Sequence, residues 1–177
     1  MRRQYKNTLP PVFAHVLTAC VVLCLLACSR PDFEAIANYK QFLEKAKPSL
    51  SKMNQAREDL FQLGDPDEMT PKFKDELLPQ IQQLSDLAKG QPEPEVERLA
   101  RIHAKLKGVL IAYSEATAAL VDRLEAIATN GKLGDGDRAQ RLERTLLRWG
   151  EADQRFGKDM ADLVNELSKY LDDQASR

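Results

Sequence analysis

Cysteine and histidine are the side chains that most readily bind metals or act as nucleophiles, and the sequence contains three cysteines and two histidines. Cys20, Cys24 and Cys28 recur every four residues, a spacing that could gather thiolates around a metal ion on one side of a helix. Cys20 and Cys24 lie inside an apolar run, however, and Cys28 follows it directly. We therefore interpret the first two as small apolar residues and predict no metal site.

His103 is the only histidine beyond this apolar run. Di-iron bundles need a Glu-x-x-His on each of two helices, but Ala100 stands three residues before His103. A non-covalent haem could use His103 with Met53 or Met160, although a partly buried histidine with one hydrogen-bond partner is the simpler interpretation. The sequence contains no Gly-x-Ser-x-Gly, P-loop or Gly-x-Gly-x-x-Gly motif. We predict no catalytic residue, no enzymatic activity and no bound cofactor.

Apolar residues recur at steps of three and four from Asp32 onward, which is the period of an amphipathic helix. Turn-forming residues at 64–67, 90–94 and 130–136 divide this pattern into four candidate helices. The first covers about 32–63, and the second is expected to begin with Thr70 as its cap and Pro71 in its first turn. The third runs from about 96 to 129, and the fourth starts at a cap formed by Asp135 or Asp137.

No segment shows the period-two alternation of a β-strand. Four helices joined by short connections predict an all-α fold, and specifically an antiparallel up-down-up-down four-helix bundle. The turn signals are strong and evenly placed, which disfavours one long helix in a two-chain coiled coil.

Pro48 and Pro79 fall inside the first two predicted helices. A proline in a helix interior removes one backbone hydrogen bond and crowds the preceding turn, at a cost of about 3 kcal/mol. The first helix is therefore expected either to kink near Lys47 or to be two helices with Pro48 in the first turn of the second. The second helix is expected to kink at Pro79 in the same way.

Arg57, His103 and Asp153 occupy positions where the helical pattern calls for apolar residues. In the antiparallel arrangement Arg57 and Asp153 come within about one helical turn of each other, near Tyr113 and Thr117. A buried ion pair can specify how helices align even when it adds little stability. We predict an Arg57–Asp153 ion pair in the core, with the alternative that the pattern drifts and both side chains reach solvent.

Two further patterns mark the surfaces of the last two helices. Gly150 and Gly157 lie on one side of the fourth helix, where they either permit a close approach by another helix or simply sit on an exposed face. Basic residues also form stripes on the fourth and third helices, namely Arg141, Arg144, Arg148 and Arg155, and Arg98, Arg101 and Lys105. Such stripes are usually solvated and paired with nearby glutamates, and the alternative is an anionic partner.

The amino-terminal segment has the composition of a secretory signal. Its only charged residues before the apolar run are Arg2, Arg3 and Lys6, and the run from Val12 to Ala27 is 16 residues long. A basic start followed by a short apolar stretch is typical of a signal peptide. The stretch is shorter than the roughly 20 residues that a membrane-spanning helix needs.

The end of this run, Leu25-Leu26-Ala27-Cys28, resembles the lipobox of bacterial lipoproteins. The resemblance implies cleavage between Ala27 and Cys28 and a diacylglycerol on the Cys28 thiol, often with an acylated amino group. Leu26 departs mildly from the family pattern, in which a small residue is commoner. The resemblance also implies, by the sorting rule of enteric bacteria, that Ser29 after the cysteine favours the outer membrane over the inner one. The alternatives are an uncleaved membrane anchor or an ordinary signal peptide cut near the same place.

This reading divides the chain into a removed signal peptide (1–27), a lipidated amino terminus with a short tether (28–31) and a helical bundle domain (32–177). Removing the signal peptide leaves 23 basic and 27 acidic residues, a net charge of −4. A mildly acidic surface argues against non-specific nucleic-acid binding.

The function expected from these features is that of a membrane-anchored lipoprotein of the bacterial cell envelope. It would be non-enzymatic, would reach the membrane through the lipid on Cys28, and would bind or scaffold another envelope protein. The alternative is a carrier of a small molecule or cofactor, with a pocket between helices opened by Pro48 and Pro79.

Overall fold

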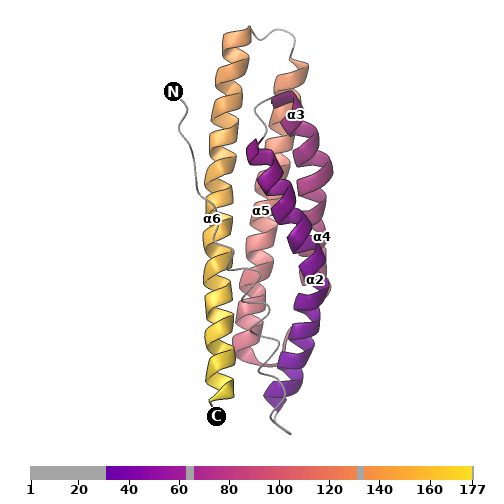
Figure 1. The fold of residues 1–177 in the computed structure, drawn as a ribbon, viewed down its shortest axis with the longest axis vertical. Helices are drawn as coiled ribbons and strands as arrows, with labels where there is room; N and C mark the ends of the chain where they lie inside the picture. Colours follow the sequence, from indigo (N-terminus) through magenta and orange to yellow (C-terminus); the bar gives the residue numbers. More distant parts are fainter. Residues whose placement is uncertain (1–30, 63–65, 131–133, 177) are drawn as a thin grey trace.

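The computed structural model describes residues 31–62, 66–130 and 134–176. These residues form four long helical segments that lie side by side, and no strand occurs among them (Figure 1). The predicted all-α class is therefore confirmed. The predicted signal peptide, the cleavage site after Ala27 and the lipidation site Cys28 lie outside the described residues.

The first segment, α2 (Pro31–Gln62), is one helix that continues through Pro48, so the alternative of two separate helices is wrong. Its buried face is wider than a single line of residues at steps of three and four. Leu43 and Leu50 are half-buried, while Phe42 and Ser49, one residue earlier, are buried. A helix on the surface of a core commonly buries such a broad stripe, with three or four residues for every two turns.

The second segment begins earlier than predicted and contains an unusual turn. It consists of α3 (Pro66–Pro71), the π-helical turn η2 (Lys72–Leu77) and α4 (Leu78–Gly90). The predicted start at Thr70–Pro71 is therefore wrong, because Pro66 already occupies the first helical position, where a missing N–H costs nothing.

The π-helical turn η2 lies just before Pro79. The Leu78 N–H donates to the carbonyl of Phe73, five residues back, whereas an α-helix would use the carbonyl four residues back. The wider turn therefore precedes the proline ring, which would crowd the preceding carbonyls of a regular helix. The apolar residues that recur at steps of three and four along this segment are all buried: Phe73, Leu77, Ile81, Leu84 and Ala88.

The third and fourth segments are α5 (Glu97–Thr129) and α6 (Asp135–Ala175). The residue that caps α6 is Gly134, with φ −66° and ψ 156°. The predicted cap at Asp135 or Asp137 is wrong, because both residues lie inside the first turn. At Asp137 a carboxylate can still interact favourably with the positive end of the helix dipole.

The helices pack in the order α2, α4, α5, α6, each against the next, and η2 also contacts α2. Two ion pairs join α5 to α6, Arg98–Asp173 at 2.7 Å and Lys105–Glu166 at 2.6 Å. Residue numbers thus rise along α5 as they fall along α6. A third pair, Lys74–Glu125 at 2.6 Å, joins η2 to the last turns of α5. The core between the helices holds the aromatic side chains of Tyr39, Phe42, Phe73, Tyr113, Trp149, Phe156 and Tyr170.

Candidate functional site

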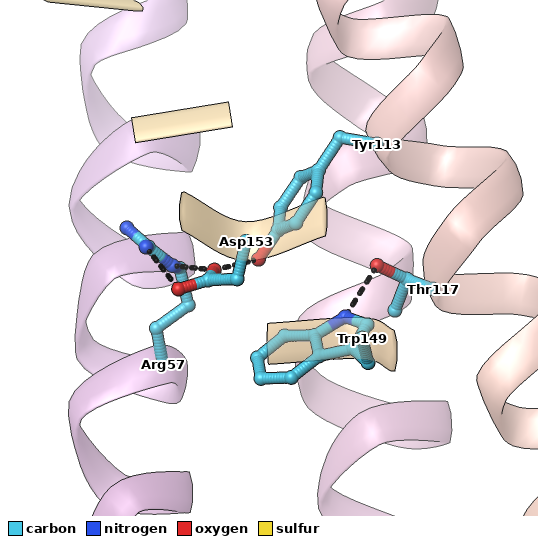
Figure 2. A network of polar contacts seen from close by, with 5 residues as sticks. All are labelled: Arg57, Tyr113, Thr117, Trp149 and Asp153. Atoms are coloured by element: carbon cyan, nitrogen blue, oxygen red, sulfur yellow. Dashed lines mark hydrogen bonds and ion pairs between the residues drawn. The ribbon is translucent and has the colours of Figure 1, made fainter. Parts of the chain in front are cut away.

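The structure brings Arg57 of α2 and Asp153 of α6 together in the core (Figure 2). Arg57 Nε donates to Asp153 Oδ1 at 2.8 Å, and a terminal guanidinium nitrogen donates to Oδ2 at 2.8 Å. Only 7% and 9% of the two side chains is exposed, so the solvent-facing alternative does not occur. Two parallel bonds between a guanidinium and a carboxylate form the strongest and most directional kind of ion pair.

Tyr113 of α5 adds a third donor to the same carboxylate. Its hydroxyl donates to Asp153 Oδ1 at 2.6 Å, and its ring stacks on Phe156 with the centroids 4.1 Å apart. The Arg57 guanidinium also lies 5.6 Å from the Phe156 ring centroid, within cation–π range. This polar layer, made of Arg57, Tyr113 and Asp153, ties three helices together at one level of the core.

The shifted pKa values of Tyr113 and Arg57 are typical of residues that stabilise a fold. Burial and the neighbouring Asp153 charge raise the pKa of Tyr113 well above its ordinary value. Burial opposes the charge on Arg57, but the hydrogen bond and charge of Asp153 outweigh it and the pKa of Arg57 is raised. Near neutral pH both groups therefore remain donors to Asp153, and neither is poised to transfer a proton.

A second polar contact lies one turn away from the polar layer. Trp149 Nε1 on α6 donates to Thr117 Oγ1 on α5 at 3.3 Å (Figure 2), and the Trp149 ring meets Phe73 edge-on, with the centroids 4.7 Å apart. The sequence placed Tyr113 and Thr117 near the ion pair but did not predict these hydrogen bonds. The available signal was that buried tyrosine and tryptophan side chains need a polar partner.

His103 is fully buried between α4 and α2. Its Nε2 lies 2.9 Å from the backbone carbonyl of Ala88, and since a carbonyl can only accept, Nε2 carries the proton. The ring meets Tyr39 and Phe42 edge-on, at 5.7 and 5.4 Å between centroids. Nδ1 is buried without a hydrogen-bond partner among the described residues. Met53 and Met160, considered above as haem ligands, are buried in the core.

Protonation of His103 is expected to destabilise the fold. Burial is the main cause that lowers the pKa of His103, Lys107 lowers it further, and Glu93 and the Ala88 hydrogen bond oppose the shift. The unfolded chain has the ordinary value of about 6.5 and so binds the proton first as the pH falls. We expect the free energy of unfolding to decrease below about pH 6.5, by at most about 1.4 kcal/mol per pH unit from this residue.

Urea unfolding between pH 5 and 8 measures this effect, with His103→Gln as the comparison because carboxylates also titrate in acid. The difference in pH dependence between the two proteins isolates His103. Parallel curves for wild type and variant would contradict the prediction.

The two basic stripes differ in their surroundings. On α5, Arg98 pairs with Asp173 and lies 5.3 Å from the Tyr170 ring centroid, Arg101 lies 3.4 Å from Glu97, and Lys105 pairs with Glu166. The stripe on α6 consists of Arg141, Arg144, Arg148 and Arg155. All four are exposed, and none of them forms an ion pair with another described residue. The stripe on α5 is therefore neutralised within the chain, and that on α6 is not.

Gly150 leaves open space around it. A Cβ placed there would meet nothing within 4 Å, so no described helix approaches α6 closely at Gly150. Of the two interpretations given above, this position fits an open face.

Two shallow grooves open on the surface. One, of about 430 Å³, lies between α5 and α6 and is lined by Lys105, Gly108, Val109, Ala112, Asp159, Asp162, Leu163 and Glu166. The other, of about 380 Å³, lies beside α3 and η2 and is lined by Glu68, Pro71, Lys72, Asp75 and Glu76. Neither is lined by Pro48 or Pro79, the residues that were expected to open a pocket for a carried molecule.

Within the described ranges, no helix has an apolar stretch long enough to cross a membrane. Over the same residues, no group of three or more His, Cys, Asp and Glu side chains is placed to hold a metal ion. Comparison of the chain with protein-family models, with curated proteins and with solved structures finds no match.

Proposed function

We propose that this chain is a lipid-anchored, non-enzymatic protein of the bacterial cell envelope, whose helical domain binds or scaffolds another envelope protein. The proposed non-enzymatic, binding or scaffolding role rests on one observation, which is that the polar groups of the core are directed towards one another. Arg57, Tyr113 and Asp153 bond to one another in the interior, so they hold helices in place. What the domain offers to other molecules is its charged outer surface.

The proposed shape of residues 32–177 is an up-down-up-down antiparallel bundle whose first two helices bend at Pro48 and Pro79. The pairs Arg98–Asp173 and Lys105–Glu166 support opposite directions for α5 and α6. A bundle of this kind presents long helical faces on a core that holds its side chains fixed. Such faces suit the binding of another helical or extended protein surface.

The proposed anchor rests on the lipobox-like residues Leu25 to Cys28 and on the basic, then apolar, residues before them. Each buried CH₂ of an acyl chain contributes about 0.8 kcal/mol, and one chain alone holds only marginally. Two or three chains on one cysteine would make release negligible. Ser29 supports the outer membrane as the destination.

Replacing Cys28 with serine is expected to block lipidation, because the thiol is the acceptor of the diacylglycerol. The precursor should then remain uncut, or the domain should appear in the soluble fraction. Incorporation of labelled palmitate, together with membrane fractionation, measures both effects. Cys24→Ser is the matched control, since it lies four residues earlier in the apolar run and should leave labelling intact. A processed Cys28→Ser protein that stays in the membrane would overturn the anchor.

The scaffolding role is tested in intact cells. Crosslinking followed by recovery of this chain should yield one specific envelope protein from wild-type cells, and less of it from the Cys28→Ser strain. Recovery of the same partner in equal amounts from both strains would show that the anchor does not bring the two proteins together.

A further inference from the structure

Charge is ordered along one face of α6. Residues 137, 141, 144, 148, 151, 155, 159, 162, 166 and 169 follow one another at steps of three and four, so their side chains lie on the same side of the helix. All but two of these side chains are exposed, and Asp159 and Glu166 are half-buried. Arginines predominate before the midpoint of the helix and carboxylates after it.

Most of these charges are not neutralised within the chain. Among the described residues, the arginines at 141, 144, 148 and 155 and the carboxylates at 159 and 162 form no ion pair. Glu166 is paired with Lys105 of α5. One helix thus presents a largely positive half and a largely negative half.

We propose that a second copy of this chain covers this face, with its α6 antiparallel to the first and the two-fold axis between residues 153 and 154. Arg148 of each copy then lies opposite Asp159 of the other, Arg144 opposite Asp162, and Arg141 opposite Glu166. The remaining members of the face also match, because Glu151 meets Arg155 and Asp137 meets Lys169. When each charged residue of this face is matched with the nearest one on the facing helix, the two charges of every pair are opposite.

Neighbouring alignments do not share this property. Sliding one helix by about one turn in one direction places Arg148 opposite Arg155, and Asp137 opposite Glu166. Sliding it by about one turn in the other direction places Arg155 opposite itself, and Glu151 opposite Asp159. Both shifted alignments keep some opposite-charge pairs, but only the first alignment has no like-charge pair, so the charge order favours it over these two neighbours.

The groove between α5 and α6 gives the second copy a place to lie. Its α5 wall is made of Lys105, Gly108, Val109 and Ala112, and a Cβ added at Gly108 would meet nothing within 4 Å. Beyond Ala112, the exposed residues Ala119 and Ala126 continue this small-residue edge at steps of seven. The arginine half of a partner α6 can therefore approach the carboxylates at 159 and 162 past the small residues Gly108 and Ala112, while Lys105 lines the same groove and pairs with Glu166.

Exposed ion pairs add little affinity each, so the charges mainly fix direction and alignment. The dimer is accordingly expected to weaken as salt is raised. This pairing goes beyond the proposed function, because it depends neither on the lipid nor on an envelope partner. It leaves the outer surfaces of α2 and α4 available to other proteins.

Crosslinking of the full chain in cells tests the proposal. In Arg148→Cys/Asp159→Cys, a short bis-maleimide should join two copies, and the dimer should appear on a reducing gel. Arg148→Cys/Glu143→Cys is the matched control, because Glu143 is exposed on a different side of α6 and should give little dimer. Both variants are also made with Cys20→Ala, Cys24→Ala and Cys28→Ser, so that no native thiol can account for a crosslink and the result is independent of the anchor.

Charge exchange in this crosslinking background provides the decisive comparison. Arg144→Asp alone and Asp162→Arg alone should each weaken the dimer roughly tenfold, since either change turns two attractive pairs into two repulsive ones. Combining them restores opposite charges and should restore the crosslink. Glu143→Arg, a charge reversal off this face, should have no effect. Three outcomes would each overturn the proposal. The folded protein could give no dimer, it could crosslink only to a different protein, or its crosslinking yield could stay the same in all the charge variants.

Discussion

Replacing Asp153 with alanine is expected to lower the free energy of unfolding by about 3–5 kcal/mol, the usual cost of removing one partner from a buried ion pair. The substitution strands the Arg57 guanidinium and the Tyr113 hydroxyl, both of which donate to this carboxylate. Urea unfolding followed by circular dichroism measures the loss. Asp122→Ala is the control, because Asp122 is exposed on α5 and its replacement should change stability by no more than about 0.5 kcal/mol.

A triple variant distinguishes the effect of the unpaired buried charge from the effect of lost packing volume. Arg57→Met/Tyr113→Phe/Asp153→Leu removes every member of the polar layer and keeps apolar volume in its place. Buried ion pairs replaced in this way often leave stability unchanged or increased, so the triple variant should be markedly more stable than Asp153→Ala. If it is as unstable as the single variant, packing at this level, and not the unpaired cation, accounts for the loss.

Phe73→Ala is expected to cost about 3–5 kcal/mol, which is typical of deleting a large aromatic side chain from a core. Phe73 is fully buried in the π-helical turn η2 and packs edge-on against Trp149. Its removal leaves a cavity where the second segment meets α6. Thermal or urea unfolding measures the change.

Leu147→Ala is the matched control for Phe73→Ala, since Leu147 is a large apolar residue that is 59% exposed. Its replacement should change stability by no more than about 0.5 kcal/mol. Comparable losses in the two variants would mean that Phe73 is not part of a well-packed core.

The helices and most of their buried faces could be predicted from the sequence because they depend on periodicity alone. On α5, His103, Tyr113 and Thr117 fall in one unbroken pattern of threes and fours, and all three are buried. Arg57 and Asp153 were detectable for the same reason, since a charged residue stands out where a long apolar repeat is otherwise complete. Pairing them required only that the helices alternate in direction.

The ends of helices and the details of hydrogen bonding could not be read in this way. Pro66 and Pro71 are equally acceptable at the start of a helix, so residue type alone does not say at which of them the second segment begins. Gly134 caps α6 although two aspartates follow it, because capping depends on backbone angles that composition does not reveal. The π-helical turn before Pro79 is likewise a local backbone adjustment without a distinct residue pattern.

The polar layer also bears on how the chain finds its native structure. Along α6 the core positions one heptad to either side of Asp153 are Leu146 and Met160, so apolar contacts alone would tolerate a helix docked seven residues too far in either direction. In each of these misfolded forms Arg57 would be enclosed among aliphatic side chains with no carboxylate to neutralise it. A collapsed chain with α6 misaligned would thus carry an unpaired buried charge, and this energetic cost favours its reopening. The buried ion pair is therefore expected to disfavour misaligned docking of α6, whatever it adds to the stability of the finished protein.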